Sequence, residues 1–312
     1  MFLQVPVFFY NKIENSPLLS STVKAHLALF LVALIYGANY SIAKIVLDDE
    51  YIQPLPFIVL RAVSGMLLFW LFHLLFIKER LARKDFGRVI LCGALGVAIN
   101  QTFFFSGLKW TTPISASLIM TMTPILVLIG SAFILGEKIN LRKIAGIILG
   151  ATGAILLITY GKSLQFHANQ LLGNLFILIN ATSYALYIVL VKSLMRRYHP
   201  ITVVKWIFTF GFLMVLPFGS SGLVATDWTA LTPMIWVAVA YVLLFTTFLA
   251  YLLNAAALAK VNASVVSIYI YLQPLLAGLI AVTWGKEIVD WIKIISALLI
   301  FTGVYLVSSG KK

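Results

Sequence analysis

The sequence predicts an all-α membrane protein whose ten transmembrane helices form two inverted five-helix repeats around a central cavity. Three observations predict this fold: the composition, a regular series of long apolar segments, and a likeness between the two halves of the chain. Of the 312 residues, 62% are hydrophobic and 11% are charged, with a mean hydropathy of +1.02. Soluble domains carry about 25% charged residues, so the composition excludes a soluble globular protein. The sequence also lacks the alternating strands of a membrane β-barrel.

Ten apolar segments of roughly 20 residues, each long enough to cross about 30 Å of hydrocarbon, follow one another along the chain. The connections between them are short and leave no room for a soluble catalytic domain. Residues 1–23 lack a positively charged start and are interrupted by Pro6, so we expect a cytoplasmic tail rather than a signal peptide. The predicted helices are, in order, 24–46, 55–77, 87–108, 112–135, 141–160, 169–194, 200–219, 230–256, 261–284 and 290–309.

Positive charges are concentrated on one side of the predicted membrane. With the N-terminus in the cytoplasm, all but six of the 23 Lys and Arg residues fall on the cytoplasmic side. This bias predicts that both termini are cytoplasmic. The net charge of +13 therefore reflects topology and does not predict a nucleic-acid partner. The six exceptions are Lys44, Arg61, Lys109, Lys162, Lys286 and Lys293.

The two halves of the chain, residues 24–160 and 169–309, resemble each other. The segment from Tyr36 to Lys44 recurs from Tyr184 to Lys192 with the Tyr and Lys retained. Five helices per half is an odd number, so the second half must enter the membrane from the opposite side. Such inverted repeats are typical of secondary transporters, whose substrate site lies between the halves. Further matched pairs are Pro56 and Pro200, Arg61 and Lys205, Ser117 and Ser267, Thr121 and Tyr271, Pro124 and Pro274, Gly136 and Gly285, and Gly153 and Gly303.

Polar side chains recur on one face of several predicted helices. A polar group that faces lipid is costly, so these residues face either a water-filled pathway or a neighbouring helix. Because the polar faces occupy repeat-related positions, we favour the pathway. Asn100 and Gln101 point about 100° apart, so we expect one of them to face the cavity. The predicted pathway residues are Tyr36, Asn39, Tyr40, Lys44, Asn100, Gln101, Ser117, Thr121, Asn180, Tyr184, Tyr187, Thr247, Tyr251, Asn254, Ser267 and Tyr271.

Pro124 and Pro274 fall within predicted helices at matching positions. A proline inside a helix removes one backbone hydrogen bond and kinks the chain, so we expect the pair to be hinges rather than static kinks. Arg61 and Lys192 are expected to serve gating or structure. The basic, tyrosine-rich pathway suits amino acids or other carboxylate-bearing metabolites.

The chain resembles the drug/metabolite transporter superfamily, in particular its ten-helix EamA type. The likeness covers about residues 24–309 and is carried by YGANYSIAK with PLPFIVLRAVSG, by NQTFFFSGLKWTTPISASLIMTMTP, and by the GEK turn with its glycine-rich helix. The resemblance implies two five-helix halves around a central cavity, export or exchange of small metabolites, and residence in a bacterial inner membrane. It implies no particular substrate.

We therefore expect a secondary transporter of small metabolites, an amino-acid or related exporter or facilitator that works by alternating access. No Asp or Glu lies in the middle of a predicted helix, so the carrier is expected to equilibrate or exchange its substrate, or to couple to protons by another route. The alternative is a multidrug or cation efflux carrier, which normally needs a buried carboxylate.

Two other classes fit the sequence less well. A membrane-embedded enzyme would need a His/Asp or paired-acid site, and Asp48, Asp49 and Glu50 have no histidine near them in the sequence. A channel would need a selectivity-filter loop. The sequence predicts no catalytic residue, no cofactor and no metal site. The expected partners are a small-molecule substrate and the lipid bilayer.

Overall fold

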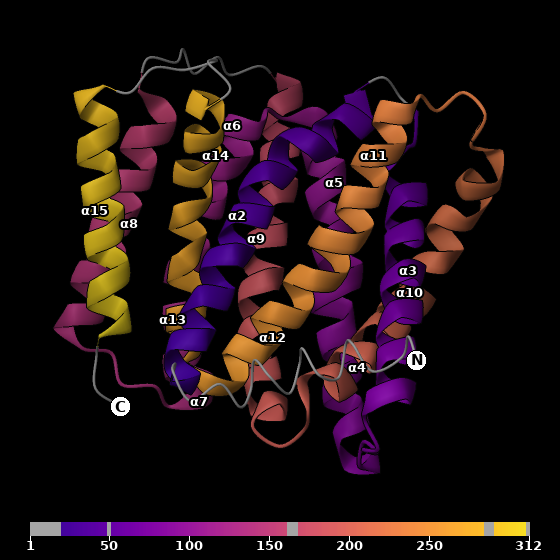
Figure 1. The fold of residues 1–312 in the computed structure, drawn as a ribbon, viewed down its shortest axis with the longest axis horizontal. Helices are drawn as coiled ribbons and strands as arrows, with labels where there is room; N and C mark the ends of the chain where they lie inside the picture. Colours follow the sequence, from indigo (N-terminus) through magenta and orange to yellow (C-terminus); the bar gives the residue numbers. More distant parts are fainter. Residues whose placement is uncertain (1–19, 49–50, 161–167, 284–289, 310–312) are drawn as a thin grey trace, which may run out of the picture.

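The computed structural model describes residues 20–48, 51–160, 168–283 and 290–309, and these residues form a bundle of helices (Figure 1). Ten of its helical segments are long and apolar enough to cross a membrane. The predicted all-α fold with ten membrane-spanning helices is confirmed. We number these segments as spans 1 to 10 in chain order. Most of the predicted tail, residues 1–19, lies outside the described residues, and the first helix begins at Ser21.

Spans 4 and 5 begin where the sequence provides a helix cap, and span 4 also ends at one. Thr112 and Asn140 each accept a hydrogen bond from a backbone N–H in the following first turn. Gly136, with φ of 66°, ends span 4 in a left-handed conformation that favours glycine. The elements are α2 (Ser21–Asp48), α3 (Pro54–Phe76), η1 (Arg83–Asp85), α4 (Phe86–Gly93), η2 (Ala94–Ile99), α5 (Asn100–Trp110), α6 (Pro113–Met120), α7 (Thr123–Leu135) and α8 (Leu141–Thr159).

The second five spans repeat this order. The elements are α9 (Ala168–Met195), α10 (Pro200–Ala225), α11 (Pro233–Tyr241), η3 (Val242–Leu249), α12 (Ala250–Lys260), α13 (Ala263–Ile268), η4 (Tyr269–Tyr271), α14 (Leu272–Thr283) and α15 (Trp291–Ser308).

Interruptions of the α-helices also recur at matching places. Span 3 contains the π-helix η2 directly before Asn100, and span 8 contains the π-helix η3 directly before Ala250. Span 4 breaks into α6 and α7 at residues 121–122, and span 9 changes to 3-10 helix at η4. Pro124 and Pro274 follow these breaks within the first turn of the next helix, where the backbone N–H has no helical partner to lose. Each proline therefore restarts a helix instead of kinking one in its middle.

Helices of each repeat pack on the first helix of the other repeat. α5 packs on α9 and α12 packs on α2; α7 packs on α9 and α14 packs on α2. Two like-with-like pairs complete the bundle, α3 against α10 and α8 against α15, and they lie at opposite flanks (Figure 1). The packing thus agrees with a two-repeat layout in which spans 1, 3, 4, 6, 8 and 9 surround the centre.

The α8 and α15 pair approaches closely along its glycines. A Cβ added to Gly303 would lie 2.5 Å from the carbonyl oxygen of Gly146, and one added to Gly146 would lie 2.8 Å from that of Gly303. No side chain fits between backbones this close, as is common where membrane helices pack on small residues.

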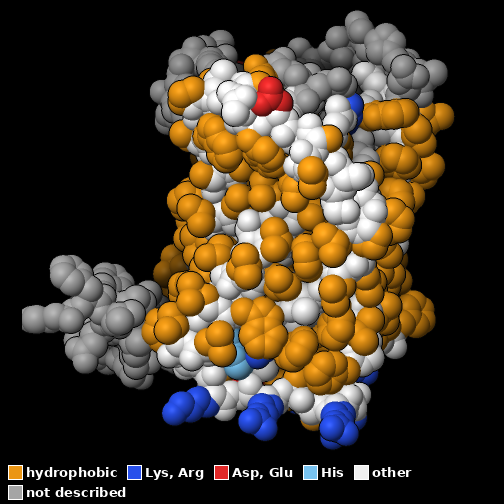
Figure 2. Space-filling model, turned by 90° about the vertical axis from the view of Figure 1, so that its right-hand side faces the viewer, with side chains coloured by type: hydrophobic (Ala, Val, Ile, Leu, Met, Phe, Trp, Pro, Cys, Tyr) orange, Lys and Arg blue, Asp and Glu red, His pale blue; other side chains and the backbone are white. Residues whose placement is uncertain are grey.

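The surface suits a bilayer. Hydrophobic side chains cover the middle of the face in Figure 2, and Lys and Arg side chains project from one end. Large apolar side chains are well exposed on several spans, among them Leu74, Phe133 and Leu171. Exposed apolar area on this scale marks a surface that contacts lipid or other proteins, and the ten membrane-length helices favour lipid.

Candidate substrate cavity

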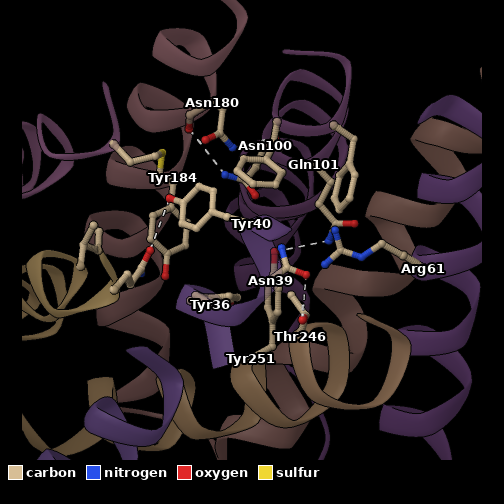
Figure 3. A pocket seen from close by; sticks show the side chains of 15 residues that line it. Tyr36, Asn39, Tyr40, Arg61, Asn100, Gln101, Asn180, Tyr184, Thr246 and Tyr251 are labelled. Atoms are coloured by element: carbon tan, nitrogen blue, oxygen red, sulfur yellow. Dashed lines mark hydrogen bonds between the residues drawn. The ribbon is translucent and has the colours of Figure 1, made fainter. Parts of the chain in front are cut away.

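A cavity of about 70 Å³ lies at the centre of the bundle, where the two repeats meet (Figure 3). At about 10–15 Å³ per water, this space holds roughly five to seven waters. The lining residues are Tyr36, Asn39, Tyr40, Arg61, Asn100, Gln101, Phe104, Phe105, Met120, Asn180, Tyr184, Thr246, Tyr251, Ile270 and Gln273.

Half of the predicted pathway residues line this cavity. We expected one of Asn100 and Gln101 to do so, but both reach it, because Asn100 faces Asn180 and Gln101 faces Tyr251. Two further predicted residues, Tyr187 and Asn254, line a smaller adjoining pocket. The eight in the main cavity are Tyr36, Asn39, Tyr40, Asn100, Gln101, Asn180, Tyr184 and Tyr251.

Arg61 is the only charged residue among the described residues that line the cavity. Its side chain is buried, and Nε donates a hydrogen bond of 2.8 Å to Thr247 Oγ1 of the other repeat. The guanidinium lies 4.6 Å from the centre of the Phe105 ring and points toward Asn39 and Gln101 (Figure 3). In the part of the chain that the structure describes, no carboxylate pairs with it. The cavity therefore carries a positive charge that these residues do not compensate.

Two amide side chains join spans 3 and 6 on the opposite wall. Asn180 Nδ2 donates to the backbone oxygen of Asn100 at 2.8 Å, and Asn100 Nδ2 donates to that of Asn180 at 3.5 Å. Asn180 Oδ1 and Gln101 Oε1 are buried without a hydrogen-bond partner in the described part of the chain. Such acceptors are costly to leave unused, and a bound molecule with N–H groups would satisfy them.

Spans 1 and 8 meet at the floor of the cavity. Asn39 Oδ1 accepts a hydrogen bond of 3.1 Å from Thr246 Oγ1.

Tyr251 donates from its hydroxyl to the backbone oxygen of Gly96 at 2.7 Å, inside the π-helix η2. Ser183 does the same to Leu95 at 2.6 Å. Carbonyls left without a partner by the wider helix thus bind side chains from the other repeat.

The remaining predicted pathway residues lie outside the cavity. Thr121 and Ser267 turn back and donate to the backbone oxygens of Leu118 and Ser264. Thr247 holds Arg61 instead of lining the space. Ser117 is half-buried and Tyr271 is fully buried, and neither belongs to the lining. The side chain of Lys44 lies outside the described residues.

Lys192 lies at the end of span 6 and serves the neighbouring helix. Its side chain is buried, and Nζ donates to the backbone oxygens of Leu258 and Val261 at the end of α12. A lysine in this place satisfies carbonyls that have no helical partner and complements the negative end of the helix dipole.

Six lining residues were not predicted from the sequence. Thr246 is adjacent to the predicted Thr247, and the π-helix η3 shifts which of the two faces inward. Gln273 precedes Pro274 and is a polar residue in an apolar helix, a signal that could have been used. The apolar members carry no signal that separates them from the hydrophobic core. The six are Phe104, Phe105, Met120, Thr246, Ile270 and Gln273.

A central cavity with polar side chains in its wall, between two matched halves built of ten apolar spans, is the architecture of a secondary membrane transporter. The chain belongs to the EamA-like transporter family, whose profile matches residues 23–159 and again residues 171–309. Both matches fall on the two halves recognised in the sequence.

Proteins similar in sequence are also described as transporters. An uncharacterized transporter of Archaeoglobus fulgidus is 27% identical over 289 residues, which are 92% of this chain and 98% of the relative. The uncharacterized transporters YetK and YvbV of Bacillus subtilis are 25% and 29% identical over 311 and 302 residues, covering 92% and 94% of their own lengths and 97% and 94% of this chain. A crystal structure with 19% identity and a TM-score of 0.72 covers 92% of this chain and 95% of that one, which shows a shared fold.

Proposed function

We propose that the protein is a carrier of small metabolites that bear a carboxylate, an amino acid or a related compound, exported or equilibrated by alternating access of two inverted halves. The proposal places it in a bacterial inner membrane, which the family resemblance implies. Both termini are placed in the cytoplasm, because the Lys and Arg residues are biased to that side.

The observation that carries the substrate class is Arg61. Its guanidinium is buried at the cavity without a carboxylate partner among the described residues, and a charge in this position is costly unless a counter-charge reaches it. A substrate carboxylate supplies that charge and forms charge-assisted hydrogen bonds. An amino group on the same molecule fits the acceptors Gln101 Oε1 and Asn180 Oδ1.

The runner-up is efflux of cationic or amphipathic drugs. A cation in this cavity would meet Arg61, and the described lining residues include no carboxylate to balance it. The tyrosine rings offer cation–π contacts of about 0.5–2 kcal/mol, which is less than the repulsion to be overcome in a buried site. The same lining residues include neither a histidine nor an acid that could serve an enzyme.

Counterflow in proteoliposomes tests the proposal. Vesicles are preloaded with unlabelled amino acids, the amines that correspond to them, nucleosides or organic cations, at equal pH on both sides. We expect a labelled amino acid to accumulate and the matching amine to be excluded. Arg61→Gln should abolish accumulation, and Arg61→Lys, which keeps the charge, should retain part of it. Arg88→Gln is the matched control, because Arg88 is exposed and remote from the lining.

Two results would contradict the proposal. Transport of amines that survives in Arg61→Gln would establish the cation carrier instead. A requirement for a pH gradient in a separate uptake assay would replace exchange by proton coupling.

A further inference from the structure

Glu137 lies at the end of the molecule where α2 begins and α7 ends (Figure 1). The left-handed Gly136 turns the chain, and the Glu137 N–H donates to the backbone oxygen of Ser131 at 3.1 Å. The side chain is then directed inward and is only 8% exposed. A carboxylate buried to this extent must be well paired.

The partners of Glu137 come from both repeats. Oε1 accepts from the backbone N–H of Ala263 at 3.1 Å, and Oε2 accepts from Ser264 Oγ at 2.8 Å. Lys143 Nζ, from the first turn of α8, completes the set at 3.0 Å from Oε2. Glu137 therefore ties the turn between spans 4 and 5 to the first turn of span 9 with charge-assisted hydrogen bonds.

Span 9 runs from the hydrogen bonds of Glu137 to the cavity. α13 begins at the Glu137 contact, and the following residues Ile270 and Gln273 line the cavity. Directly before Ile270, Tyr269 of η4 shares a hydrogen bond of 2.8 Å with His26 of α2. A path from the cavity to this end that runs along α13 would part α13 from the first repeat, and the Glu137 bonds would then break.

The glutamate and the lysine of this ion pair have counterparts in the second repeat. With one residue inserted after Gly285, Glu287 and Lys293 align with Glu137 and Lys143. The caps match as well, because the helix that follows begins with an Asn or Asp that accepts from the N–H of the respective lysine at 2.9 Å.

The two hydrogen-bond donors to Glu137, the Ala263 N–H and the Ser264 hydroxyl, differ in this respect. The positions that match Ala263 and Ser264 are Pro113 and Ile114. Proline has no backbone N–H and isoleucine has no hydroxyl, so neither donor exists there. The two donors that Ala263 and Ser264 supply to Glu137 therefore have no counterpart at Pro113 and Ile114.

We propose that Glu137 is the latch that holds the Lys- and Arg-rich end of the pathway shut, and that the missing donors at the opposite end bias the resting carrier toward this closed state. The latch rests on the proposed function only in requiring that the cavity opens to this end during transport; it is independent of the substrate. Glu137 is a positioning residue, because it does not touch the cavity.

Cysteine labelling tests the latch without any substrate. The single native cysteine, Cys92, is buried and is replaced by serine. Ala33→Cys then places a reporter thiol in a small pocket that also contains Tyr36, Tyr269 and Ile270, between the cavity and the latch. A membrane-impermeant maleimide is applied from the latch side to vesicles of known orientation.

We expect Glu137→Ala to raise the labelling rate of the reporter thiol by about tenfold, the effect of losing roughly one charge-assisted hydrogen bond. Ser264→Ala, which removes one of the bonds and keeps the carboxylate paired, should raise it by a smaller factor. Glu287→Ala is the matched control and should leave it unchanged.

An unchanged rate in both Glu137→Ala and Ser264→Ala, in protein that elutes and melts as the parent does, would overturn the latch. Should Glu137→Ala not fold, Ser264→Ala alone decides. An equal increase in Glu287→Ala would overturn the asymmetry. Labelling as expected, together with failure of amino-acid counterflow, would retain the latch and reject the substrate class.

Discussion

Two adjacent threonines of span 8 have different roles at the cavity. Thr246 binds Asn39 and lines the cavity, whereas Thr247 accepts from Arg61 and itself donates to the Val242 backbone oxygen at 2.8 Å. The fixed hydroxyl of Thr247 orients the guanidinium, and the side chain has no place in the cavity itself.

Thr247→Val is isosteric and removes the acceptor of Arg61. We expect the KM for the carboxylate-bearing substrate to rise by at least about tenfold. The guanidinium loses a hydrogen bond worth about 1.5–3 kcal/mol and no longer points into the cavity. Thr247→Ser should keep the KM near that of the parent. The concentration dependence of counterflow measures both, and equal KM values for the valine and serine variants would refute this role.

Tyr251 connects the cavity wall to the π-helix of the other repeat. Tyr251→Phe leaves the Gly96 oxygen without its 2.7 Å donor, and we expect the free energy of unfolding to fall by about 1–3 kcal/mol. Tyr305→Phe removes a hydroxyl from a residue that is 69% exposed and should change nothing. Thermal unfolding in one detergent compares the two, and a Tyr251→Phe midpoint equal to that of Tyr305→Phe would count against the contact.

At the scale of elements, the α8 and α15 pair depends on glycine. Gly303→Val would place a Cβ 2.5 Å from the Gly146 oxygen, so the helices must separate, and we expect a loss of at least about 1–3 kcal/mol from overpacking. Gly278→Ala is the control, since a Cβ there meets nothing within 4 Å and alanine favours a helix by about 1 kcal/mol. A melting temperature that fell equally in both variants would refute this account.

Spans 4 and 9 offer the elements that can bend. Each carries a break followed by a proline in the first turn of the next helix, and the hinge role remains a prediction. Pro274→Ala supplies an N–H that lets η4 extend into a continuous α-helix, so we expect turnover to slow severalfold with the KM little changed. Initial rates of counterflow at saturating substrate measure the turnover. An unaltered turnover would indicate that the break is static.

The sequence predicted elements better than side-chain directions. Length and hydropathy suffice to locate all ten spans, because crossing a bilayer imposes one length and one composition. The polar arc of Tyr36 to Tyr40 also points where expected. Thr121 and Ser267 do not, because a hydroxyl in a helix can bond to its own backbone instead of facing a cavity. The π-helices, which decide between Thr246 and Thr247, have no signature in a single sequence.

At the scale of the whole molecule, orientation is the prediction to test. The Lys- and Arg-rich end holds the end of α15, so we expect a fluorescent protein fused to the C-terminus to mature in a bacterial host and alkaline phosphatase fused there to stay inactive. The reverse result would place the latch at the outer face. It would turn the resting state inward and leave the geometry of the cavity as described.

The paired π-helices also carry historical information. Well under 1% of residues in proteins adopt this form, and a π-turn accommodates one residue more than the α-helix around it. η2 and η3 end at matching positions in spans 3 and 8, directly before Asn100 and Ala250. Matched widening of this kind is what the duplication of a half-length gene that already contained one widened helix would leave in both halves.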